Sequence, residues 1–298
     1  MKLLTKTITP RTKNVLLMHF VIMIFGITGI LGKLITIESV PLVFWRTTIG
    51  GFAIYIWLKS KGKITAKTPK TLLKLAGIGV LIAIHWITFF ASIKVSNVSV
   101  ALTMMAISPM FVGLLEPLIF KRKLDLKEIV VAAVVLLGVA TILSFNTQYV
   151  EGMVLGIISA FFASLFATLN GVMINKHDAE NISLVELSSA SIAVLIFMTV
   201  TGEIGLELFI MSFNDWLLIL ILAVVATSFA FTAFTHVMTS LTPFTTAVAI
   251  NLEPIYAMIL ALIIFGEDEV MGPQFYLGAS LIIGAVALNG ILKSPEKT

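Results

Sequence analysis

The sequence predicts an all-α integral membrane protein with ten transmembrane helices, arranged as two inverted five-helix repeats. Three observations carry this prediction. Of the 298 residues, 58% are hydrophobic and only 12% are charged, and the mean hydropathy is +1.06. Soluble proteins have about 25% charged residues, so the composition indicates a membrane protein. In addition, apolar runs of membrane-spanning length recur along the chain, and segments of the first half recur in the second.

Charges, prolines and glycine clusters divide the chain into ten apolar stretches of about 17 to 24 residues. Each is long enough to cross about 30 Å of hydrocarbon at about 1.5 Å per residue. The first stretch ends without a small-residue cleavage site, so we expect it to remain as a helix. The stretches cover residues 14–32, 41–58, 72–93, 98–120, 128–145, 152–174, 184–200, 216–238, 243–265 and 274–292.

The basic residues gather on alternate connections between these stretches. If the N-terminus is cytoplasmic, seventeen of the twenty lysines and arginines fall in cytoplasmic segments, whereas Lys33 and Lys94 lie outside and Arg46 lies within a span. Lysine and arginine are enriched in cytoplasmic loops of membrane proteins. The sequence therefore predicts a multi-pass protein of the bacterial cytoplasmic (inner) membrane with both termini in the cytoplasm. The acidic run 267–269 is predicted to be a solvated outer loop.

An internal duplication becomes visible when the chain is shifted by 145 residues. Residues 97–120 then align with 242–265, and Pro109 meets Pro254. Because each half holds five helices, an odd number, the second copy must enter the membrane from the opposite side. Inverted repeats of this kind are typical of secondary transporters, which bind substrate near the midplane between the two halves. The predicted repeats are residues 14–145 and 152–292.

Short motifs accompany these repeats. They are Leu252-Glu253-Pro254, Phe265-Gly266-Glu267, Phe44-Trp45-Arg46 and Ser108-Pro109. In these motifs, over nearly its whole length, the chain resembles the drug/metabolite transporter superfamily, in its ten-helix EamA-type branch. The first half departs from the pattern, with Phe120-Lys121-Arg122 where the family commonly ends in glycine and glutamate. The resemblance implies transport, but the branch carries amino acids, other metabolites and drugs on one scaffold, so it leaves the substrate open.

Glu253 is the first candidate for a substrate-binding or coupling residue, because it lies beside Pro254 halfway along an apolar stretch. A charge at that depth costs roughly 2.5 to 3.5 kcal/mol on insertion scales, so it normally faces protein or water. The alternative for Glu253 is a structural acid that bonds a neighbouring helix near the proline break. Arg46 is the second candidate, since its guanidinium group suits a substrate carboxylate. The alternative for Arg46 is snorkelling to the interface. Further candidates are His85, Asn251, Trp86, Tyr256, Asn170 and Lys33.

The further candidates also have structural interpretations. His85 has an unperturbed pKa of about 6.5, which suits proton transfer, but a hydrogen-bonded histidine in a helix bundle is the alternative. Asn251 is either a cap of a disturbed helix or a substrate contact, and Lys33 is either an interfacial lysine or a site residue. Two other acids are interpreted as interfacial partners of nearby cations. They are Glu116 near residues 121–123 and Glu186 near Lys176.

The predicted function is secondary transport, with export of amino acids or related small amphipathic metabolites by alternating access at a midplane cavity. The alternative is a proton-coupled exporter of lipophilic cations or drugs. An integral membrane enzyme is the alternative from another class, but the four histidines form no metal-binding pattern and no catalytic motif is present. We expect no enzymatic activity, no cofactor and no metal. The expected partners are a small-molecule substrate, membrane lipids and coupling protons, without nucleic acid, in a monomer or homodimer.

Overall fold

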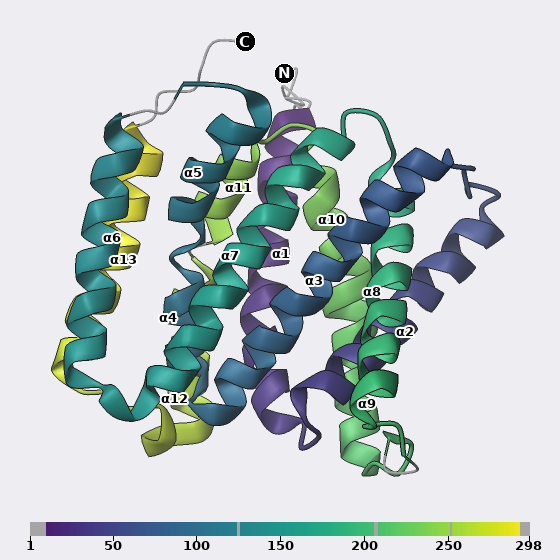
Figure 1. The fold of residues 1–298 in the computed structure, drawn as a ribbon. Helices are drawn as coiled ribbons and strands as arrows, with labels where there is room; N and C mark the ends of the chain where they lie inside the picture. Colours follow the sequence, from purple (N-terminus) through teal and green to yellow (C-terminus); the bar gives the residue numbers. More distant parts are fainter. Residues whose placement is uncertain (1–9, 124–125, 206–207, 251, 293–298) are drawn as a thin grey trace, which may run out of the picture.

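The computed structural model describes residues 10–123, 126–205, 208–250 and 252–292, and the regular structure within these ranges is entirely helical. The all-α class is therefore confirmed. Seven helical stretches in the described ranges are long and apolar enough to cross a membrane: Thr12–Leu34, Ser39–Ser60, Pro69–Val95, Val98–Phe120, Thr147–Met173, Ala179–Thr201 and Phe213–Val237. Figure 1 shows the helices as a bundle in which α1 (Pro10–Leu34) begins and α13 (Pro273–Leu292) ends at the same end, the upper end in this view.

The helices follow the predicted apolar stretches along the chain. In the first half they are α1 (Pro10–Leu34), α2 (Ser39–Ser60), α3 (Pro69–Val95), α4 (Val98–Met105), α5 (Ser108–Phe120) and α6 (Leu126–Phe145). In the second half they are η1 (Thr147–Tyr149), α7 (Val150–Met173), α8 (Ala179–Thr201), α9 (Phe213–Ala223), η3 (Val224–Phe229), α10 (Ala230–Val237), α11 (Pro243–Ile250), α12 (Glu253–Phe265), η4 (Gly266–Glu269) and α13 (Pro273–Leu292).

Two of the predicted stretches, 98–120 and 243–265, each consist of two helices rather than one. In both cases a proline stands in the first turn of the second helix: Pro109 in α5 and Pro254 in α12. Proline lacks a backbone N–H, but the first N–H groups of a helix have no intrahelical acceptor, so proline is well tolerated at these positions. The two prolines are the pair that the shift of 145 residues aligns.

The eighth predicted stretch contains a π-helical turn, η3, between α9 and α10. Within it the Thr227 hydroxyl donates to the carbonyl of Leu222 at 2.9 Å. Helix α2 approaches this turn closely at Gly50, where an added Cβ would lie 3.0 Å from a methyl carbon of Thr227 and 3.2 Å from the Ala223 carbonyl oxygen. Single π-helical turns are frequent at functional sites, and here the turn presents Thr227 to the interior of the bundle.

Packing places small residues at close helix contacts and large apolar residues on the outside. Helices α6 and α13 lie side by side at one edge of the bundle (Figure 1). They meet at Gly138 and Gly278, where a Cβ on either residue would come within 2.8 Å of the other's carbonyl oxygen. Small residues are the usual means by which membrane helices approach each other. The outer surface exposes Leu73, Val200 and Ile263 by 75% or more, as expected for side chains that face lipid.

Candidate functional site

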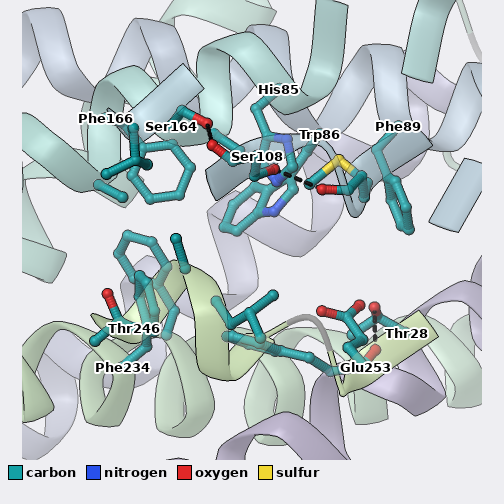
Figure 2. A pocket seen from close by; sticks show the side chains of 18 of the residues that line it. Thr28, His85, Trp86, Phe89, Ser108, Ser164, Phe166, Phe234, Thr246 and Glu253 are labelled. Atoms are coloured by element: carbon teal, nitrogen blue, oxygen red, sulfur yellow. Dashed lines mark hydrogen bonds between the residues drawn. The ribbon is translucent and has the colours of Figure 1, made fainter. Parts of the chain in front are cut away.

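A cavity of about 100 Å3 lies between helices of the two halves of the chain (Figure 2). Its wall is mostly apolar and includes the rings of Phe25, Trp86, Phe89, Phe166, Phe231 and Phe234. Its polar lining residues are Thr28, Arg46, His85, Ser108, Ser164, Thr246 and Glu253. In Figure 2, His85, Ser108 and Ser164 lie on one side of the cavity, and Thr28, Thr246 and Glu253 on the other. The arrangement is an apolar pocket with a few polar groups, which is typical of small-molecule sites.

Arg46 lies inside the bundle rather than at the interface, with 2% of its surface exposed. Its Nε–H donates to the hydroxyl of Thr227 in η3 at 3.0 Å, and its guanidinium carbon lies 3.8 Å from the ring centre of Trp86. The stacking on Trp86 provides a cation–π interaction that stabilises a desolvated guanidinium group. Within the described residues Arg46 forms no ion pair. Its positive charge is therefore held in place by neutral partners at the wall of the cavity.

His85 is fixed by α7. Its Nδ1 lies 2.8 Å from the hydroxyl oxygen and 3.1 Å from the carbonyl oxygen of Ser159, whose hydroxyl donates in turn to the His85 carbonyl at 2.9 Å. The imidazole ring also lies against Phe89 and Phe166, with ring centres 6.2 and 5.6 Å apart. The structural interpretation of His85 is thus supported, and the same ring also lines the cavity.

Glu253 lies opposite His85, in the first turn of α12, with its carboxylate near Thr28 (Figure 2). The start of a helix favours negative charge because its backbone N–H groups carry partial positive charge. The nearby hydroxyl of Thr28 already has a backbone acceptor, since it donates to the Phe25 carbonyl at 2.6 Å. Among the described residues we find no hydrogen bond or ion pair of the Glu253 carboxylate. It is therefore open to a ligand in the cavity.

A model of the EamA-like transporter family matches residues 12–144 and 150–291 of the chain. The chain belongs to this family. The EamA-like transporters are part of the drug/metabolite transporter superfamily, so the predicted resemblance is confirmed. The chain is a multi-pass membrane protein and a transporter by family.

This EamA-family transporter is similar to three known proteins over most of its length. An uncharacterized transporter, YxxF of Bacillus subtilis (strain 168), is 24% identical over 294 residues, which are 95% of this chain and 92% of the relative. An uncharacterized transporter of Archaeoglobus fulgidus is 24% identical over 256 residues, 86% of each chain. A solved crystal structure that is 16% identical superposes with a TM-score of 0.68, over 96% of this chain and 100% of the other, and shows that the fold is shared.

The structure brings together half of the predicted site residues of this EamA-family transporter. Glu253, Arg46, His85 and Trp86 line the same cavity. The other predicted residues lie elsewhere or outside the described part. Lys33 pairs with Glu269 at one end of the bundle, Tyr256 is 44% exposed on the outer surface, Asn170 contacts Glu186, and Asn251 lies outside the described residues.

For two acids, Glu186 and Glu269, the predicted surroundings are wrong. Glu186 was expected to pair with Lys176 at the interface, but it is fully buried and accepts a hydrogen bond from Asn170. Glu269 was expected in a solvated loop, but it too is fully buried, because η4 turns it back towards the start of α4. The predicted pairing of Glu116 with a nearby cation is confirmed by its 3.1 Å contact with Arg122.

Proposed function

We propose that this EamA-family protein is a secondary carrier that exports amino acids or related small amphipathic metabolites by alternating access. In this proposal it crosses the bacterial inner membrane ten times, in two inverted repeats of residues 14–145 and 152–292, with both termini in the cytoplasm. The broken helices at Pro109 and Pro254 support an internal repeat. An even number of crossings is supported by the position of the start of α1 and the end of α13 at the same end of the bundle (Figure 1).

The observation that carries the proposed substrate class is that Arg46 and Glu253 line the same cavity. An amino acid carries a carboxylate and an ammonium group, which these two side chains complement in charge. The guanidinium group of Arg46 suits a carboxylate in particular, because it offers two parallel N–H donors. The aromatic wall around Phe166, Phe231 and Phe234 suits an apolar side chain of the substrate.

The same observation weighs against the alternative, a proton-coupled exporter of lipophilic cations. Such an exporter needs a carboxylate in an otherwise uncharged cavity, so that the carboxylate binds either a proton or the cation. Arg46 places a positive charge in this cavity, and like charges in a low-dielectric environment repel strongly. A permanent cation is therefore disfavoured next to Arg46, whereas a zwitterion is not.

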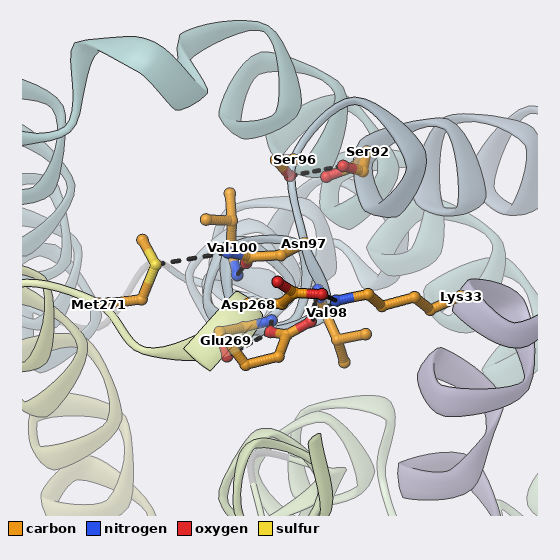
Figure 3. A network of polar contacts seen from close by, with 10 residues as sticks. Lys33, Ser92, Ser96, Asn97, Val98, Val100, Asp268, Glu269 and Met271 are labelled. Carbon is orange, nitrogen blue, oxygen red and sulfur yellow. Dashed lines mark hydrogen bonds and ion pairs between the residues drawn. The ribbon is translucent and has the colours of Figure 1, made fainter. Parts of the chain in front are cut away.

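Alternating access requires contacts that close one end of the cavity and open again. At the end of the bundle with Lys33 and Glu269, polar contacts join the two halves (Figure 3). A second set joins Thr36 to Asp215. The backbone N–H of Thr36 donates to Asp215 Oδ1 at 2.7 Å, and the Thr36 hydroxyl donates to Asp215 Oδ2 at 2.8 Å. The opposite end contains a hollow of about 550 Å3 between the ends of α2 and α10 and the start of α8. This asymmetry supports a carrier state closed at the Glu269 end.

A thermal-shift experiment on the purified protein in detergent tests the proposed function. The wild type, Arg46→Gln and Glu253→Gln are heated with each L-amino acid and with tetraphenylphosphonium as a lipophilic cation. A ligand at 100 times its Kd stabilises the folded state by about 2.7 kcal/mol, so a specific amino acid should raise the melting temperature of the wild type. We expect this shift to be lost in both variants.

The matched control is Glu151→Gln, which removes an exposed carboxylate at the start of α7 and should retain the full shift. Stabilisation of the wild type by tetraphenylphosphonium alone would replace the amino-acid proposal by the cation exporter. An amino-acid shift of equal size in Arg46→Gln would remove Arg46 from the proposed site.

A further inference from the structure

A second polar site lies outside the cavity, where α7 meets α8. Glu186 and Asn170 are both fully buried, and Asn170 Nδ2 donates to Glu186 Oε2 at 3.2 Å. The remaining oxygens of both side chains, Glu186 Oε1 and Asn170 Oδ1, have no hydrogen-bond partner among the described residues. Ser183, one turn earlier on α8, has a buried hydroxyl that is also unpartnered. Buried polar groups are usually satisfied, so this cluster needs an explanation.

The two unpartnered oxygens belong to the same two groups that share the hydrogen bond. In the ionised form of Glu186 both are acceptors, and neither has a donor to accept from. A proton on Glu186 Oε1 changes this, because the protonated carboxyl group becomes a donor and the Asn170 carbonyl oxygen is an acceptor without a partner. One proton would therefore complete a cyclic pair of hydrogen bonds, with N–H donating in one direction and O–H in the other.

We propose that Glu186 and Asn170 form a proton-binding site of this protein, separate from the cavity that Arg46 and Glu253 line. Proton binding places hydrogen on Glu186 Oε1 and neutralises the carboxylate. Release leaves a carboxylate that needs water or another donor, so it requires the contact between α7 and α8 to loosen.

No other charge compensates Glu186 in the described structure. The titratable side chains of its own helix and of the helices that pack against it are Glu180 (α8), Arg46, Tyr55 and Lys59 (α2), Lys70, Lys74, His85 and Lys94 (α3), Glu151 (α7) and His236 (α10). None of these forms a hydrogen bond or ion pair with the Glu186 carboxylate. Arg46 and His85 face the cavity, and His236 and Glu180 face the hollow at the start of α8. Burial without a counter-charge favours the neutral carboxyl group over the carboxylate.

The position of the site suits a role in coupling, and this part of the inference rests on the proposed transport function. Glu186 lies five residues, about 7.5 Å along α8, beyond Asn181, the last residue of that helix that lines the hollow at its start. On the other side its backbone carbonyl packs directly on Gly79 of α3, which leaves no room there for a Cβ. Any movement of α8 away from α3 or α7 would change the surroundings of Glu186, so its protonation state and the helix position are linked.

Infrared difference spectroscopy tests proton binding without any substrate. Spectra of the wild type minus Glu186→Gln are recorded in detergent over a range of pH. The introduced glutamine amide can form the same two hydrogen bonds as a protonated glutamic acid, so this variant should fold. We expect a carboxylic-acid C=O band at neutral pH in this difference, lost at high pH. Asn170→Leu should retain the band and shift it to higher frequency, because the C=O group loses its N–H donor.

The matched control, Glu203→Gln, removes an exposed carboxylate and should give no carboxylic-acid band in its own difference spectrum at neutral pH. Absence of the band from the Glu186→Gln difference, with a carboxylate band in its place, would overturn the proton-binding site. Stabilisation of the wild type by Na+ that Glu186→Gln abolishes would also overturn it, in favour of a metal cation at the same oxygens.

The coupling role is tested in proteoliposomes with a mixture of radiolabelled L-amino acids. Glu186→Gln should exchange amino acids across the membrane like the wild type but lose accumulation driven by a pH gradient. Accumulation at the wild-type level in this variant would overturn the coupling role. If the wild type transports no amino acid, the proposed function fails, whereas the infrared result on proton binding stands independently.

Discussion

Glu269 and Glu186 are two fully buried carboxylates of one protein, and their surroundings differ sharply. Glu269 lies at the start of α4, where it accepts from the backbone N–H groups of Val98 at 3.1 Å and Ser99 at 2.9 Å, and from the Ser99 hydroxyl at 2.8 Å. Lys33 adds an ion pair at 2.9 Å. Glu186 has one hydrogen bond, from Asn170, and no ion pair in the described structure.

The difference indicates two ways in which a bundle accommodates a buried acid. Around Glu269 every partner is a donor, one of them charged, and the helix start adds a favourable dipole, so the ionised carboxylate is stabilised where it lies. Around Glu186 the donors are too few for a carboxylate, and the free oxygen of Asn170 is an acceptor. We therefore expect Glu269 to act as a fixed structural anion that joins the two halves, and Glu186 to act as a group that gains and loses a proton.

The largest expected effect is a difference in protein stability between variants of the two acids. Glu269→Ala leaves two buried N–H groups, the Ser99 hydroxyl and the Lys33 ammonium without their acceptor, and each buried donor left unsatisfied costs roughly 1–3 kcal/mol. Glu186→Gln should leave the stability unchanged or raise it, because a neutral amide replaces a buried acid. Melting temperatures in detergent measure both. Equal losses in the two variants would contradict the distinction between a fixed anion and a proton-binding group.

Much of the fold was predictable from the sequence, because apolar length and charge position are local properties. The helical stretches, the family and the intramembrane charges Arg46 and Glu253 all follow from single runs of residues. Both of these charged residues line the cavity, because a charge in an apolar membrane-spanning run is unfavourable against lipid and faces the interior of the bundle instead.

The surroundings of Glu186 and Glu269 were not predictable, because they depend on contacts between distant segments. Glu269 meets Ser99 across 170 positions of sequence, and its neighbour Asp268 is exposed, so nothing in the acidic run distinguishes the buried residue from the solvated one. Glu186 is paired through a helix contact with Asn170 that no spacing along the chain reveals. The π-helical turn that presents Thr227 to Arg46 likewise packs against Gly50, a residue of a distant segment.

A smaller effect sharpens the description of the Glu269 site. Lys33→Met removes the ion pair, but the Lys33 side chain is 23% exposed and three uncharged donors to Glu269 remain. Solvent screening weakens such a contact, so we expect a loss of about 1 kcal/mol, well below that of Glu269→Ala. Double-mutant analysis with Glu269→Gln should show coupling between the two positions. A loss as large as that of Glu269→Ala would mean that the ion pair, rather than the start of α4, stabilises the buried carboxylate.

The smallest effect concerns Asp268, the acid beside Glu269. Its carboxylate lies 4.0 Å from the Lys33 ammonium, but its side chain is 78% exposed, so water competes for both charges. Exposed pairs of this kind contribute little, and Asp268→Asn should change stability by less than about 0.5 kcal/mol. Because the substitution is almost isosteric, it serves as the matched partner of Glu269→Gln in the same melting experiment. A large loss in Asp268→Asn would show that Lys33 is held mainly by the exposed acid, and the contrast between Glu269 and Glu186 would then rest on the three uncharged donors of Val98 and Ser99.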